Sequence, residues 1–129
     1  MSGQESVQEL ADRFQRCSKI LTAIGDETRL HLMTEMMKMG ECRGVRVGAI
    51  TEKVNLSRPA VSHHIRILKD AGILKVRKEG TMNFYYFDPE TESLENLVET
   101  LQLAIEITKG LPDRRGVYAA AESEKQEES

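Results

Sequence analysis

The sequence predicts a mainly α-helical fold that contains one β-hairpin. Near the N-terminus, apolar residues recur at alternating steps of three and four, which is the spacing of one helix face. Ser57 and Pro59 form a typical helix start, in which a capping hydroxyl precedes a proline in the first turn. Between Ile73 and Phe87 the apolar period becomes two, on either side of Glu79-Gly80. The 129 residues are enough for one such domain.

The N-terminal part is expected to form two helices. The first covers residues 7–24, and Gly25 ends it. Its apolar positions form a heptad seam: Val7, Leu10, Phe14, Cys17, Leu21 and Ile24. Asp26 is suited to cap the second helix, because its carboxylate can accept from free amides of the first turn, and Gly40 is suited to end it.

The middle of the chain predicts a helix-turn-helix arrangement. After a loop over residues 41–46, a short helix is expected from Val47 to Val54. The next helix begins at Ser57 and ends at Ala71-Gly72. Its apolar stripe consists of Val61, Ile65 and Leu68.

A hairpin and a long helix follow. The two strands are expected at residues 73–78 and 82–87. Asp88-Pro89 then resembles the start of the last helix, and Gly110-Leu111-Pro112 breaks it. Its apolar positions include Leu94, Leu97, Val98, Leu101, Ala104, Ile105 and Thr108.

This order of elements predicts a winged helix-turn-helix domain over residues 1–112. The acidic segment 113–129 is expected to be a disordered tail. Both terminal helices carry more apolar surface than one small domain can cover, so we predict a two-fold homodimer that packs through its N- and C-terminal helices. In the alternative, both stripes pack within one chain.

The charge distribution indicates a surface that binds a polyanion, although the net charge of −3 argues against such binding. Residues 57–87 carry six bases and two acids, whereas residues 88–129 carry eleven acids and four bases. Such asymmetry is typical of a basic binding surface beside an acidic tail. The sequence contains no apolar run long enough to span a membrane and no signal peptide, and its two cysteines fit a reduced, cytoplasmic protein.

The helix from Ser57 carries the best candidates for binding double-stranded DNA. A recognition helix presents its first turns to base edges in the major groove, where Arg58 can fork onto a guanine and Ser62 allows close approach. The Ser57 hydroxyl and the helix N-terminus favour the binding of a DNA phosphate. The predicted contacts from this helix are Ser57, Arg58, Ser62, His63, His64, Arg66 and Lys69.

The hairpin adds three basic candidates near its tip, Lys75, Arg77 and Lys78. Alternatively, these are ordinary solvated charges on a small hairpin. His63 and His64 are adjacent and therefore diverge by about 100° on a helix, so they cannot chelate one ion together. Helix packing is the alternative to DNA contact for this pair.

These motifs resemble the ArsR/SmtB family of bacterial repressors. The resemblance rests on Asp26-Glu27-Thr28-Arg29-Leu30, on Leu56 to Gly72 with its paired histidines, and on the wing that ends at Tyr85-Tyr86, and it covers about residues 7–109. It implies a dimeric transcriptional regulator that binds an imperfect inverted repeat and represses an adjacent gene. In many members a small inducer weakens DNA binding.

The family's inducer sites do not carry over onto this sequence. The positions that match an arsenic-binding Cys-x-Cys pair are Arg46 and Gly48, and residues 89–109 contain no histidine for a zinc site. We therefore predict no metal and no cofactor. A redox switch between Cys17 and Cys42 remains an alternative, because Cys42 lies near Arg43 and Arg46, whose charges favour a reactive thiol.

Nothing in the sequence predicts an enzyme, because it has no phosphate loop, nucleophile elbow or paired-carboxylate motif. His31 lies among several methionines and suggests a copper(I) cluster, but these residues fit a helix core. Two other functions remain alternatives to a DNA-binding repressor: a thiol- or metal-responsive sensor-repressor, and a winged-helix protein-interaction module.

Overall fold

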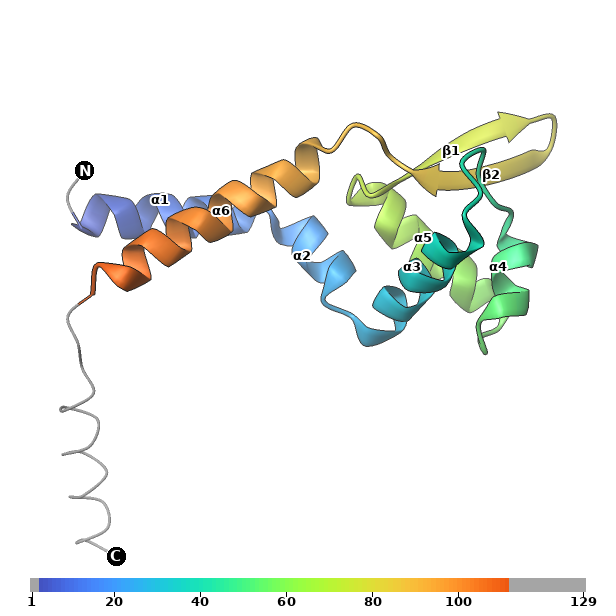
Figure 1. The fold of residues 1–129 in the computed structure, drawn as a ribbon, viewed down its shortest axis with the longest axis horizontal. Coiled ribbons are helices and arrows are strands. Elements are labelled where there is room, and N and C mark those ends of the chain that lie inside the picture. Colours follow the sequence, from blue (N-terminus) through green and yellow to red (C-terminus); the bar gives the residue numbers. More distant parts are fainter. Residues whose placement is uncertain (1–2, 112–129) are drawn as a thin grey trace, which may run out of the picture.

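The computed structural model describes residues 3–111 and confirms a mainly α-helical fold with one antiparallel hairpin (Figure 1). The predicted tail over residues 113–129 lies outside the described residues. In chain order the elements are α1 (Gly3–Arg16), α2 (Ser18–Ile24), α3 (Glu27–Met39), α4 (Val47–Lys53), α5 (Arg58–Asp70), β1 (Leu74–Glu79), β2 (Met82–Phe87) and α6 (Glu92–Lys109).

The hydrophobic core lies where α2, α3, α4, α5 and β1 meet. Its largest fully buried apolar side chains are Leu32, Ile50, Ile65, Leu68, Leu74 and Val61. The two predicted caps of the core helices are confirmed, because the Asp26 carboxylate accepts from the backbone N–H of Arg29 at 2.9 Å, and Gly40 takes a left-handed conformation with φ of 63°.

The expectation of one continuous helix over residues 7–24 is wrong, because the helix breaks at Cys17. The Cys17 N–H is shared between the carbonyls of Arg13 and Phe14, both at 3.1 Å, and the backbone turns there. The break lets α1 pack along α6 while α2 packs against α5. A heptad spacing continues through the break, and therefore the sequence pattern alone did not reveal it.

The wing has the predicted two strands and one further pairing that the sequence did not predict. Leu74 pairs with Phe87 at its base and Glu79 with Met82 at its tip, where Gly80 has φ of 59°. Val45 forms an isolated bridge to Tyr85, with both backbone hydrogen bonds at 2.8 Å. Residues 41–46 are therefore a loop that is held against the wing by one strand-like residue.

The last helix begins later than expected, at Glu92 instead of Asp88-Pro89. The Asp88 carboxylate accepts from the backbone N–H of Glu90 at 2.8 Å, which forms a turn before the helix. From there α6 runs back alongside α1, away from the wing (Figure 1). Its outward stripe is 43 % to 52 % exposed and consists of Leu94, Val98, Leu101 and Ile105.

Candidate nucleic-acid interface

The recognition helix α5 is positioned by its cap and its buried stripe. The Ser57 hydroxyl oxygen accepts from the backbone N–H of Ala60 at 3.3 Å, as expected of an N-cap. Val61, Ile65 and Leu68 are buried, as the sequence predicts. Because these three side chains hold one face of α5 on the core, the opposite face is open to solvent.

The candidate DNA contacts on α5 differ in exposure. Ser62 and His64 are half-buried, whereas the other five are exposed: Ser57, Arg58, His63, Arg66 and Lys69. Within residues 3–111, the cations Arg58, Arg66 and Lys69 have no ion pair. The exposed face of α5 therefore carries positive charge that no described acid neutralises.

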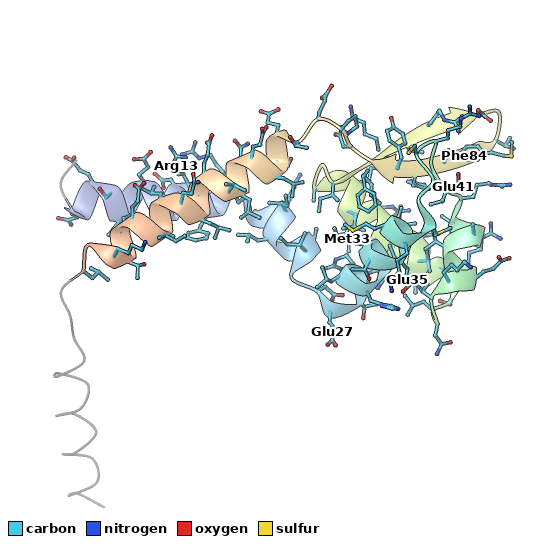
Figure 2. All side chains as sticks on the ribbon, in the orientation of Figure 1. Arg13, Glu27, Met33, Glu35, Glu41 and Phe84 are labelled. Atoms are coloured by element: carbon cyan, nitrogen blue, oxygen red, sulfur yellow. The ribbon has the colours of Figure 1, made fainter. Side chains whose placement is uncertain are left out.

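Arg58 lies across the first turn of α4. Its Nη2 atom is 3.5 Å from the place where a Gly48 side chain would begin, so the missing side chain leaves room for the guanidinium. Both residues line a groove of about 710 Å³ between α4, the 41–46 loop and the wing. Glu41 and Phe84 also line this groove, and Figure 2 shows both of them close to the hairpin. Arg58 thus begins α5 at the point where the two helices of the helix-turn-helix meet.

His64 points toward the corner between α2 and α3 and contacts Arg29. Its Nδ1 atom is 3.3 Å from Nη1 of Arg29, a residue that is only 7 % exposed. Burial, and then the Arg29 charge, lower the pKa of His64 below its ordinary 6.5, while Asp26 opposes this shift. The backbone N–H of Arg29 in turn holds the pKa of Asp26 below 3.8.

Arg29 is not among the site residues that the sequence predicts. A usable signal existed, because Arg29 precedes Leu32, Met33 and Met36 at the spacing of the buried face of α3. An arginine at an apolar-face position requires a buried set of acceptors.

The three basic residues of the wing are not equivalent. Lys75 pairs with Asp88 at 3.5 Å and with Glu90 at 3.7 Å. Arg77 pairs with Glu79, donates to the Arg43 carbonyl at 3.1 Å, and lies over the Phe84 ring at 4.6 Å. Lys78 is exposed and, in the described part of the chain, unpaired. Arg77 therefore holds the 41–46 loop on the wing, and Lys78 is the wing residue best placed to meet a phosphate.

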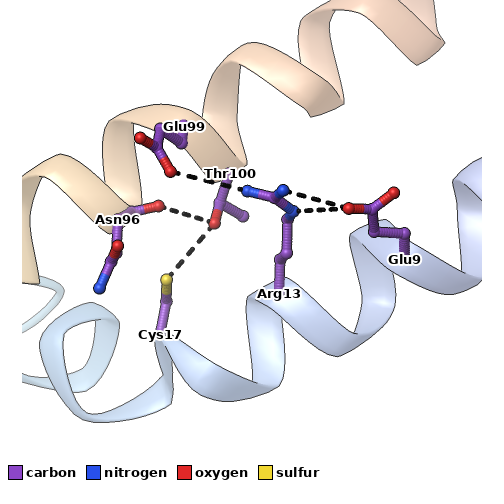
Figure 3. Close-up of polar contacts among 6 residues, drawn as sticks. All are labelled: Glu9, Arg13, Cys17, Asn96, Glu99 and Thr100. Carbon is purple, nitrogen blue, oxygen red and sulfur yellow. Dashed lines mark hydrogen bonds and ion pairs between the residues drawn. The ribbon is translucent and has the colours of Figure 1, made fainter.

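The structure does not bring the two candidate redox residues together. Both thiols are free, and Cys17 is buried while Cys42 is exposed. Cys17 Sγ lies 3.5 Å from Oγ1 of Thr100 on α6, beside an Arg13 side chain that bridges acids of both helices (Figure 3). Cys42 belongs to the 41–46 loop between α3 and α4, and this loop runs beside the wing, well away from the α1–α2 junction (Figure 1). A disulfide needs Cα atoms within about 7 Å.

Metal-binding geometry is also absent from the described residues. Between Gly3 and Leu111 no three His, Cys, Asp or Glu side chains are grouped so that they could hold a metal ion. In the same range no helix is long and apolar enough to cross a membrane.

Comparisons with known proteins point to one family. Residues 26–76 match the family model described as bacterial regulatory protein, arsR family. An uncharacterized HTH-type transcriptional regulator of Methanocaldococcus jannaschii is 37 % identical over 91 residues, which cover 70 % of this chain and 99 % of that protein. The transcriptional repressor SdpR of Bacillus subtilis is 31 % identical over 81 residues, which cover 63 % of this chain and 83 % of the repressor.

Solved structures agree with this fold. A crystal structure of an ArsR family transcriptional regulator superposes with a TM-score of 0.61 at 17 % identity, over 76 % of this chain and 95 % of the other. At that identity the likeness concerns the fold, and it supports the winged helix-turn-helix arrangement of α4, α5 and the hairpin.

Proposed function

The chain belongs to the arsR family of bacterial regulatory proteins and is a DNA-binding transcriptional repressor, and we propose that it acts as a homodimer on an imperfect inverted repeat. The observation that carries this proposal is the outer face of α5, where Arg58, Arg66 and Lys69 are exposed and unpaired within residues 3–111. Such a face matches the major groove and its flanking phosphates.

The apolar stripe on α6 supports the homodimer. Its four residues follow each other at steps of four, three and four, so they form one continuous face. Helix α1, which packs along α6, has no residue that is buried within one chain. A second copy related by a two-fold axis would cover this face and place two α5 helices about one DNA turn (roughly 34 Å) apart.

The proposed DNA contacts follow the exposure of the side chains. Arg58 is assigned to a base edge, Ser57 and Lys78 to phosphates, and the remaining cations of α5 to the backbone on either side. Since a repressor acts on chromosomal DNA, the cytoplasmic location expected from the sequence belongs to this proposal. A small inducer that weakens DNA binding also belongs to it, without an assigned site.

The test is a selection of genomic fragments by the purified full-length protein. We expect a recovered fragment that contains an inverted repeat, binds two chains, and outcompetes a scrambled duplex of equal length. Failure to retain any fragment, or a single unpaired site bound by one chain, would contradict the proposal. Repeating the selection with candidate inducers would identify the ligand class.

A further inference from the structure

Arg29 joins the recognition helix to the end of α2. Its Nη2 donates to the Thr22 carbonyl at 2.8 Å and its Nε to the Ala23 carbonyl at 2.9 Å, so it satisfies carbonyls that the last turn of α2 leaves free. Its third nitrogen, Nη1, contacts His64 Nδ1 at 3.3 Å. All three guanidinium nitrogens are therefore used inside the protein.

The chemistry of this contact determines the protonation of His64. A guanidinium has only donors, so the Nδ1 atom of His64 must accept. A neutral imidazole that accepts at Nδ1 carries its proton on Nε2. Arg29 therefore selects one tautomer and one orientation of the ring, and disfavours the protonated ring, in which Nδ1 would be a second donor facing a donor.

The position of His64 on α5 separates it from the reading face. It follows the exposed His63 by about 100° of helix rotation, which turns it toward the α2–α3 corner. The Arg29 contact joins residues 35 positions apart and is the side-chain hydrogen bond between α3 and α5 in the described residues. It adds a directional polar contact to the buried apolar stripe, so the rotation of α5 about its own axis is held by both.

We infer that Arg29 and His64 are positioning residues for DNA recognition: Arg29 orients α5 through Nδ1 of His64, and neither side chain contacts DNA. This inference rests on the proposed use of α5 as the reading helix. It also gives His64, predicted from the sequence as a DNA contact, a different role.

Two substitutions of His64 separate positioning from contact. In His64→Asn the amide oxygen can take the place of Nδ1 and accept from Arg29, whereas in His64→Gln the amide takes the place of Nε2. We expect His64→Asn to bind the selected fragment within about twofold of the original protein, and His64→Gln to bind it about tenfold more weakly, as for a lost hydrogen bond to a charged group. The matched control is His31→Asn on the exposed side of α3.

The opposite order, with His64→Gln retaining affinity and His64→Asn losing it, would show a DNA contact through Nε2 and overturn the inference. Equal affinities of all variants at a temperature where each is folded would reduce the pair to a purely structural role and also overturn it. A protein that retains no DNA fragment would overturn the proposed function together with this inference, so the two failures are distinguishable.

One further measurement uses the original protein alone, and a second compares single and double substitutions that are each folded. Nitrogen-15 spectra of the original protein at neutral pH should show His64 as the Nε2–H tautomer, and an Nδ1–H tautomer would contradict the geometry. In the background of Arg29→Lys, which loses the Nη1 donor, His64→Gln should cause no additional loss of DNA affinity. Additive losses would show that the two residues act separately.

Discussion

Replacing Leu101 with alanine should weaken the proposed dimer measurably. Leu101 is 44 % exposed at the centre of the α6 stripe, so a partner that covers it removes about two fifths of its surface from water. Full burial of a leucine side chain is worth about 1.5–3 kcal/mol, so this share is about 0.7–1.3 kcal/mol per copy. A two-fold interface contains the residue twice, which gives about 1.3–2.6 kcal/mol for the dimer.

In dissociation constants this loss is about 10-fold to 80-fold. Sedimentation equilibrium of the full chain across a concentration series measures it directly. The matched control is Leu30→Ala on α3, because Leu30 is 49 % exposed but lies away from α6. The control should leave the dimer unchanged. If Leu101→Ala and the control give the same dissociation constant as the original protein, the α6 stripe is not the interface.

Two further predictions concern the DNA interface, and one concerns the stability of the fold. Arg58→Ala should cost about 1–3 kcal/mol on the selected fragment and relax specificity at one base pair, and equal weakening on a scrambled duplex in gel shifts would reduce Arg58 to a phosphate contact. Lys78→Ala should reduce by about one the slope of log affinity for DNA against log salt concentration. Lys75→Ala should reduce this slope less, because the charge of Lys75 is already paired with Asp88 and Glu90. Equal changes of the two slopes in binding titrations would contradict this ranking. Thermal stability should fall as the pH drops below 6.5, because the pKa of His64 is lower in the folded than in the unfolded chain, and the unfolded chain therefore takes up the proton first. The loss should level off below the folded pKa of His64 and should be absent in His64→Asn, as followed by thermal melts across pH.

Features that depend on neighbouring residues were predictable from the sequence. The caps at Asp26 and Ser57, the glycine end at Gly40 and the buried stripe of α5 each follow from a few consecutive side chains, and the structure confirms them. A cap needs only a side-chain oxygen and the free amides of the next turn. The same locality explains why the exposed face of α5 was correctly anticipated.

Features that depend on distant partners were not predictable in the same way. The break at Cys17 accompanies its packing on Thr100, which is 83 residues away. Arg77 holds a carbonyl 34 residues away, and Arg29 reaches a histidine 35 residues away. The spacing along α3 places Arg29 on the buried face, but no local pattern identifies its acceptors, and nothing beside Arg77 in the sequence indicates the distant carbonyl that it holds.

The distribution of ion pairs resolves the conflict between an acidic chain and a DNA-binding fold. Asp88, Glu90 and Glu79 form ion pairs with Lys75 and Arg77 and help to fix the shape of the hairpin. Arg58, Arg66 and Lys69 on the outer face of α5 and Lys78 at the wing tip have no ion pair within residues 3–111, and these are the two surfaces that a winged helix-turn-helix presents to DNA. Because binding to phosphates depends on the charge that meets them and on the counterions released, the local excess matters more than the sum of −3. The salt dependence of binding should accordingly report the unpaired cations of one face and not the net charge of the chain.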